Sequence, residues 1–220
     1  TAIMKAKIPG SLRGLFFVLL FFLPGLLSAH PHMQFNSTAE FVWQGKKLAG
    51  VFLEWQFDSF FSADIIRAYD VNADGSFDEA ETRAVFEGAF SNLRHYYFFT
   101  FIRQGDRRET PASVEKFSAF QRNGTLVYRF YVDLRSWNAG TLNLAVYDYT
   151  FFCDIRYPDG NPVTLRYDRE QVLPRWEIRE NRDNPVYYNP LGNIEDTTVY
   201  YEWKPGLETY YPREITIYYE

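Results

Sequence analysis

Two stretches near the start of the chain alternate between hydrophobic and polar residues. In "MQFNSTAEFVW" and "LAGVFLEWQF" most side chains of one parity are apolar, and this period is typical of strands with one buried face. If both apolar faces point into one core, Phe35 lies near Phe57 and Trp43 lies near Ala49. The strands then form a hairpin whose loop, Gln44–Leu48, has a common length.

The pattern becomes helical from Phe60 to about residue 97. Over "FFSADIIRAY" and "DEAETRAVFEGAFSNLRHYY" apolar residues recur at helical spacing among helix-forming residues. Strand-like segments then return, and Asn123–Gly124 is a strong signal for a tight hairpin turn. The further strands that we expect cover 117–122, 125–134, 140–157, 163–168, 197–203 and 214–220.

Residues 1–29 have the features of a secretory signal peptide. Basic residues precede the apolar run Leu15–Leu27, which is shorter than the roughly 20 residues of a transmembrane helix. A small residue, Ala29, then offers a cleavage site. The alternative is an uncleaved membrane anchor. We expect a periplasmic or secreted bacterial protein that contacts the membrane only through its uncleaved signal peptide.

Charge and cysteine content narrow the classes of protein further. Removal of residues 1–29 leaves 20 basic and 28 acidic residues, a net charge of −8. This balance argues against a nucleic-acid partner, because phosphate binding needs a basic surface. The single cysteine, Cys153, lies in an apolar strand-like run, so we expect a buried, inert thiol and no internal disulfide.

The most specific motif is "DVNADGSFDEAE", Asp70–Glu81, between the two expected helices. It matches the calcium-loop pattern D-x-[DN]-x-[DN]-G-x₅-E at every required position. Calcium takes 6–8 oxygen ligands, and Gly75 stands where such a loop turns sharply. The expected ligands, with Ser76 acting through its carbonyl oxygen, are Asp70, Asn72, Asp74, Ser76, Asp78 and Glu81.

The alternative is an Asp- and Asn-rich turn before a helix, since acidic residues favour a helix N-terminus without any metal. That alternative, a turn rich in Asp, Asn and Gly, predicts neither a glycine at position 75 nor a glutamate at position 81. The segment resembles an EF-hand in its loop and flanking helices, but the chain contains no second such loop. A single loop in an exported protein favours a structural Ca²⁺, with a Kd of roughly 10⁻⁴–10⁻³ M for extracellular modules, over a cytosolic type of sensor.

The elements together predict a mainly β fold, an antiparallel sheet or sandwich, with an inserted EF-hand-like helix–loop–helix. The class is therefore α+β. We expect residues 30–220 to form a single periplasmic domain. Its expected parts are a β-hairpin at 30–58, the helical insert at 60–97 and a β-rich remainder at 98–220.

Two of the three histidines, His30 and His32, directly follow the apolar run. Cleavage after Ala29 would give His30 a free amine, so this residue would offer an amine and an imidazole nitrogen to one metal, and His32 would add a third nitrogen. Pro31 has no N–H, which excludes the square of four nitrogens found in the amino-terminal copper and nickel motif. Imidazole suits zinc, copper, nickel and iron.

The hairpin register adds Asp58 to this second candidate site. Asp58 falls opposite Gln34 and diagonal to His32, so its carboxylate is a candidate ligand or a hydrogen-bond acceptor that orients a histidine. The alternative is that "HPH" is a solvated N-terminal tail.

Four stretches in this order resemble an uncharacterised family of bacterial periplasmic proteins, a domain of unknown function. They are "AHPH", "EWQFDSFFS", "DVNADGSFDEAE" and "VYDYTFF". Some members are labelled the periplasmic component of an ABC-type transport system, and members often lie beside nickel/cobalt exporters. The resemblance adds Asp148 to His30, His32 and Asp58 as a candidate ligand. Members commonly have proline where this chain has Tyr149.

Three functions follow from these features. The first is a non-enzymatic accessory protein of transition-metal transport or homeostasis, which exchanges Ni, Co, Zn or Cu with a membrane metal transporter and has a structural Ca²⁺. The second is a calcium-stabilised module that binds a protein or a glycan through aromatic side chains and needs no transition metal. The third is a redox enzyme with an N-terminal copper site. We expect no enzyme, because the sequence contains no nucleophile–base motif, phosphate-binding glycine loop or CxxC pair.

Overall fold

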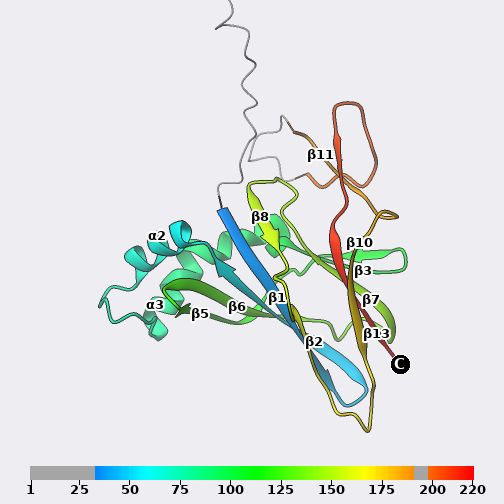
Figure 1. The fold of residues 1–220 in the computed structure, drawn as a ribbon, viewed down its shortest axis with the longest axis horizontal. Coiled ribbons are helices and arrows are strands. Elements are labelled where there is room, and N and C mark those ends of the chain that lie inside the picture. Colours follow the sequence, from blue (N-terminus) through cyan, green and yellow to red (C-terminus); the bar gives the residue numbers. More distant parts are fainter. Residues whose placement is uncertain (1–32, 191–197) are drawn as a thin grey trace, which may run out of the picture. The chain divides into compact units, whose positions relative to one another are not determined.

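The predicted fold class is confirmed by a computed structural model that describes residues 33–190 and 198–220 (Figure 1). The described chain is mainly β, with most strand pairs antiparallel and a few helices, so it is α+β. None of the described helices has the length and the apolar character needed to cross a membrane. The strands are β1 Met33–Gln44, β2 Lys47–Phe57, β3 Thr100–Gln104, β4 Arg107–Glu109, β5 Glu115–Arg122, β6 Thr125–Asp133, β7 Gly140–Val146, β8 Cys153–Arg156, β9 Val163–Arg166, β10 Arg175–Glu180, β11 Val186–Tyr188, β12 Glu208–Tyr210 and β13 Arg213–Tyr219.

Two sheets pack face to face. The first has the order β5-β6-β2-β1-β8, with β9 also paired to β1, and the second has the order β10-β13-β7-β3-β4. One hydrophobic core takes Leu53 and Trp55 from the first sheet and Leu144 and Ile215 from the second. All four side chains are fully buried. The two sheets therefore form the expected sandwich.

The first hairpin forms with one change in register. Phe35 pairs with Phe57 as predicted, but Trp43 pairs with Leu48 and not with Ala49. A bulge between Val42 and Trp43 causes the shift, because a bulge sets two residues of one strand against one of the other. It turns the larger Leu48 into the core, where 2% of the residue is exposed. The predicted five-residue loop is therefore wrong, and pairing continues to Gln44 and Lys47.

Two other strand predictions need correction. The expected strand over 140–157 is broken at Tyr147–Phe152, and its two halves, β7 and β8, belong to different sheets. The expected strand over 197–203 is not present in its described part, where Tyr200 forms only an isolated bridge with Tyr187. The tight hairpin at Asn123–Gly124 is confirmed, with Arg122 paired to Thr125.

The helical insert lies between β2 and β3 and consists of α2 Ser59–Tyr69, α3 Glu79–Val85, a π-helical turn at Phe86–Phe90 and 3-10 turns at Ser91–Phe99. Figure 1 shows α2 and α3 beside β5 and β6, at one end of the first sheet. Ser62 of α2 is fully buried, and its Oγ accepts a hydrogen bond of 2.9 Å from the N–H of Leu126 in β6. The insert is thus attached to the sheet by a polar contact as well as by apolar packing.

Asp58 caps the N-terminus of α2. Its Oδ1 accepts the N–H groups of Phe60 at 2.8 Å and Phe61 at 3.0 Å, and its Oδ2 accepts the N–H of Gln34 at 2.9 Å. Partial burial acts to raise the pKa of Asp58, but the backbone N–H groups of Gln34, Phe61 and Phe60 outweigh it, so the pKa is lowered. One carboxylate therefore joins the first strand, the second strand and the helix.

We predict that Asp58→Ala lowers the free energy of unfolding by about 1–2 kcal/mol at pH 7, because a lost cap costs ~1 kcal/mol and the bond from Gln34 is lost too. Because the folded-state pKa of Asp58 is lowered, this stabilisation is fully present above the unfolded pKa of ~3.9 and is lost as the pH falls through the folded pKa. Denaturant unfolding at several pH values would measure both effects.

Asp64→Ala is the matched control, because this aspartate lies on the same helix in an exposed ion pair with Arg67. Such pairs contribute about 0–1 kcal/mol. Equal losses for the two variants, or a loss at Asp58 that persists at low pH, would show that the cap is not the source of the stability.

Candidate metal centre

The loop Asp70–Glu81 connects α2 to α3 and begins and ends on buried carboxylates. Asp70 is the C-cap residue of α2, and Glu81 occupies the third position of α3. The exposed fractions of these two residues are 9% and 8%. Charged side chains are rarely buried without partners. The hydrogen bonds that these two carboxylates accept therefore determine whether their oxygens are available to a metal ion.

The loop winds around Asp70. Its Oδ1 accepts the N–H of Asp74 and its Oδ2 accepts the N–H of Gly75, both at 3.1 Å. Gly75 has a φ of +83°, which a residue with a side chain rarely adopts. The glycine in the motif therefore lets the chain turn back so that two consecutive N–H groups face one carboxylate.

The middle of the loop is exposed and internally hydrogen-bonded. Asn72 Oδ1 accepts the N–H of Asp74 at 2.9 Å, and Asn72 Nδ2 donates to Asp74 Oδ2 at 3.0 Å. Asp74 Oδ1 accepts the hydroxyl of Ser76 at 2.6 Å and its N–H at 2.9 Å. The hydroxyl and the N–H of Ser76 lower the pKa of Asp74 and, together with Asn72, outweigh the opposing effect of burial.

Asp78 and Glu81 form a reciprocal cap at the start of α3. The N–H of Glu81 donates to Asp78 Oδ1 at 2.8 Å, and the N–H of Asp78 donates to Glu81 Oε2 at 3.0 Å. Glu81 Oε1 also accepts the N–H of Val71 at 2.8 Å. Glu81 therefore reaches across the loop to the end of α2, the side on which Asp70 lies.

The residue types fit Ca²⁺ better than a transition metal, because carboxylate, amide and carbonyl oxygens suit a hard cation. An open and mainly apolar groove of about 600 Å³ between α2 and α3 is lined in part by Asn72, Asp78 and Glu81, and not by Asp70. In the described part of the chain, however, no three His, Cys, Asp or Glu side chains are grouped to hold a metal ion. The loop carboxylates accept backbone N–H groups instead, so ion binding must replace some of these bonds.

Sequence reasoning missed one residue at this site, Gln121 of β5. Its Nε2 donates to Asp70 Oδ2 at 3.0 Å across a separation of 51 residues. No local pattern in the sequence marks Gln121, because the contact depends on how the hairpin β5–β6 packs against α2.

The second candidate site is only partly described. His30 and His32 lie outside the described residues. Asp58 lies beside the start of β1 as the register predicted, since its N–H also donates to Gln34 O at 2.9 Å. Both of its carboxylate oxygens accept backbone N–H groups. The structure thus shows Asp58 as a helix cap that holds the first strand.

Asp148 lies in the turn that separates β7 from β8. Its Oδ1 accepts the N–H and the hydroxyl of Thr150 at 2.8 and 2.7 Å, and its Oδ2 accepts the N–H of Cys153 at 2.9 Å. The turn forms with Tyr149 in place of the expected proline, and Phe151 has a φ of +58°. Cys153 pairs with Met33 in the parallel ladder of β8 and β1. The start of β1 lies between β2 and β8. Asp58, at the end of β2, binds β1 directly, and Asp148 holds the turn that leads into β8.

Cys153 is buried, as predicted. Burial, the nearby charge of Asp148 and a hydrogen bond to that carboxylate all raise the pKa of the Cys153 thiol. The thiol is consequently protonated at ordinary pH. A protonated, buried thiol is a poor nucleophile and a poor metal ligand.

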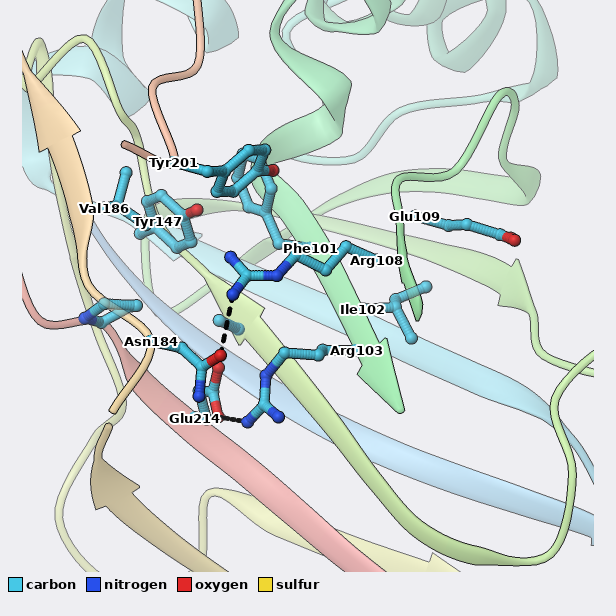
Figure 2. Close-up of a pocket in the computed structure, with 12 residues that line it drawn as sticks. Phe101, Ile102, Arg103, Arg108, Glu109, Tyr147, Asn184, Val186, Tyr201 and Glu214 are labelled. Atoms are coloured by element: carbon cyan, nitrogen blue, oxygen red, sulfur yellow. Dashed lines mark hydrogen bonds and ion pairs between the residues drawn. The ribbon is translucent and has the colours of Figure 1, made fainter. Parts of the chain in front are cut away.

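A further polar cluster, which sequence reasoning missed, lies on the second sheet (Figure 2). Arg103 forms a 2.7 Å ion pair with Glu214, and Asn181 Nδ2 donates to the same carboxylate oxygen at 2.7 Å. Arg108 donates to Asn184 at 2.8 Å. The adjoining pocket is small, with a volume of about 30 Å³, which suits ordered water. The cluster therefore connects strands and leaves little space for a ligand.

Comparisons with known proteins found one relative and one matching family model. A chain of Spirochaeta aurantia described as "Uncharacterized 15.5 kDa protein in trpE 3'region" is 35% identical over 104 residues, which cover 46% of this chain and 74% of that relative. No solved structure matches the chain. A family model with the description "Protein of unknown function (DUF1007)" matches residues 15–219. The chain therefore belongs to this family, whose function is unknown.

Proposed function

We propose that this protein is an exported, non-enzymatic domain in which the loop Asp70–Glu81 binds a structural Ca²⁺. The observation that supports this most strongly is the winding of the loop around Asp70, with two consecutive N–H groups on its carboxylate. The remaining candidate oxygens follow at the spacing of a calcium loop of the EF-hand type. The α2–loop–α3 segment is, in this proposal, a single EF-hand attached to a β sandwich.

The ion would act as a link between two helices. Asp70 ends α2 and Glu81 begins α3, so ligands from both residues would fix the helices to each other. Ca²⁺ also compensates the negative charge of Asp70, Asp74 and Glu81, which otherwise repel one another. The expected role of the ion is therefore to stabilise the helical insert, and no chemical step is assigned to it.

The alternative without a metal has a definite basis in the structure, which gives Glu81 a role as a capping residue, so the expectation from the sequence that this alternative leaves Glu81 unaccounted for is wrong. The reciprocal cap of Asp78 and Glu81 stabilises α3 by itself, and acidic side chains complement the N-terminus of a helix. The two cases differ in what Glu81 does when calcium is added. If Glu81 is only a capping residue, the stability it contributes does not depend on calcium; if it is a ligand, that stability increases when calcium is added.

We predict that Ca²⁺ raises the melting temperature of the wild-type protein and that Glu81→Gln loses most of this rise. At a concentration of about 100 times the Kd, an ion that binds only the folded state adds ~2.7 kcal/mol. The glutamine keeps one carbonyl oxygen, which can accept the N–H of Val71 or that of Asp78 but not both, and it removes the charge and the bidentate ligand. The quantity compared is therefore the rise in melting temperature on adding Ca²⁺, not the melting temperature without it. Thermal unfolding with added Ca²⁺ and with a chelator would measure the difference.

The control for this prediction is Glu79→Gln. Glu79 lies two residues earlier on α3 and pairs with Arg83 at 3.2 Å in an exposed ion pair. The melting temperature of the Glu79→Gln protein should rise with Ca²⁺ as that of the wild type does. If Glu81→Gln retains the full rise in melting temperature, or if the wild type shows none, the calcium site is rejected.

We further propose that the start of β1 presents a transition-metal site, made by His30 and His32 with Asp58 and Asp148 as supporting groups. What supports this is that Asp58 accepts the N–H of Gln34 in β1, and that Asp148 accepts the N–H of Cys153, the residue of β8 that pairs with Met33. The candidate metals are Ni, Co, Zn and Cu, and the candidate partner is a membrane metal transporter. The aspartates would act by positioning β1, because their oxygens already accept backbone N–H groups.

We predict that protein purified after export from a bacterial host begins at His30 and contains a transition metal, which His30→Ala removes. The control is His95→Ala, since His95 is the remaining histidine of the chain and is exposed. N-terminal sequencing and elemental analysis of the three proteins would test both points. An extended N-terminus, or equal metal content in all three, would reject this site.

The same measurement separates the proposal from an interaction module without a transition metal. Exposed aromatic side chains near the C-terminus favour that alternative, namely Tyr201, Trp203 and Tyr211, with exposed fractions of 45%, 57% and 36%. Such groups are common at binding surfaces for proteins. A module of this kind would contain Ca²⁺, lack a transition metal and tolerate the loss of His30.

A further inference from the structure

Gln121 links the candidate calcium loop to the edge of the first sheet. It lies near the end of β5, the outermost strand of its sheet. Its side-chain amide donates to Asp70 Oδ2 at 3.0 Å. Asp70 is the first residue of the loop, so a side chain from a distant strand contacts the position where the expected ligand set begins.

The contacts of Asp70 show what the amide does. Oδ2 accepts two hydrogen bonds, from the N–H of Gly75 and from Gln121, whereas Oδ1 accepts one, from the N–H of Asp74. A carboxylate oxygen has two lone pairs. Oδ2 is therefore saturated, and Oδ1 retains a lone pair. Gln121 holds the carboxylate in the orientation that leaves this oxygen available.

The hairpin β5–β6 holds α2 at a second point. Gln121 pairs with Leu126 across the hairpin, and the N–H of Leu126 donates to Ser62 Oγ at 2.9 Å. Ser62 and Asp70 are eight residues apart, or about 12 Å along a helix at 1.5 Å per residue. Gln121 binds Asp70 and its cross-strand partner Leu126 binds Ser62, so the hairpin β5–β6 holds α2 at two positions. The start of the loop is therefore fixed relative to the sheet.

We propose that Gln121 is a positioning residue for the Ca²⁺ site, and that the sheet edge supports the loop. This inference rests on the calcium site proposed above. It explains how a single loop of this kind is supported, since the Gln121 amide orients the first carboxylate from outside the loop. Groups that hydrogen-bond to metal ligands fix the ligand geometry and raise affinity, and their loss typically lowers affinity about 10–100-fold.

The test is Ca²⁺ affinity, measured by calorimetry on the full chain for the wild type, Gln121→Leu and Gln121→Met. Both substitutions remove the amide donor; leucine keeps a similar side-chain volume and methionine also keeps the length. We expect each variant to bind Ca²⁺ about 10–100-fold more weakly than the wild type. Two different replacements ensure that a packing defect of one of them does not decide the result.

The matched control is Gln56→Leu. Gln56 donates its amide to Thr125 Oγ1 at the same 3.0 Å in a half-buried contact, so its loss measures the effect of removing a similar bond elsewhere in the sheet. We expect Gln56→Leu to bind Ca²⁺ as the wild type does, and the melting temperatures without Ca²⁺ to fall by similar amounts in Gln56→Leu and Gln121→Leu.

The outcomes separate the two claims. If the wild type binds Ca²⁺ and both Gln121 variants bind it equally well, the positioning role is overturned and the calcium site stands. If the wild type does not bind Ca²⁺, the site and the positioning role are both overturned. Weaker binding in Gln121→Leu and Gln121→Met, with unchanged binding in Gln56→Leu, supports the inference.

Discussion

The packing of Trp55 is the interaction on which the rest of the structure depends. Its ring lies 4.8 Å from Phe35 of β1 and 4.7 Å from Phe130 of β6, measured between centroids. It also lies 6.1 Å from Phe90, the last residue of the π-helical turn, and 5.9 Å from Phe99, the last residue of the helical insert. A buried aromatic ring removes a large apolar area from water, so one side chain in the central strand β2 holds both strands beside it and the insert.

The candidate calcium loop depends on this packing although its own residues are polar. The insert must lie against the sheet before Ser62 can accept the N–H of Leu126 and before Gln121 can reach Asp70. Polar bonds of this kind contribute little net stability by themselves, about 1 kcal/mol each, but they have strict geometric requirements. Apolar burial thus supplies the stability, and the polar contacts decide where the loop sits.

The two candidate sites differ in how far sequence reasoning could reach. The calcium loop is local, because all six candidate ligands lie within one short segment whose spacing carries the chemistry. The position of Asp58 beside Gln34 followed from the alternation of the hairpin, since the register near Phe35 and Phe57 was predicted correctly. The roles of Gln121 and Asp148 could not be predicted in the same way. The role of Asp148 depends on a turn, and the role of Gln121 depends on a packing contact, and the hydrophobic pattern of the sequence predicts neither.

Local patterns determined the mainly β class, the hairpin at Asn123–Gly124, the helical insert and the loop within it, because each of these depends on near neighbours in the chain. Tertiary structure decided the bulge near Trp43, the split of 140–157 between two sheets, and the parallel pairing of β8 and β9 with β1. The physical reason is that these features follow from filling one core between two sheets. The side chain that best fills a gap, such as Leu48 in place of Ala49, is chosen by residues far away in the sequence.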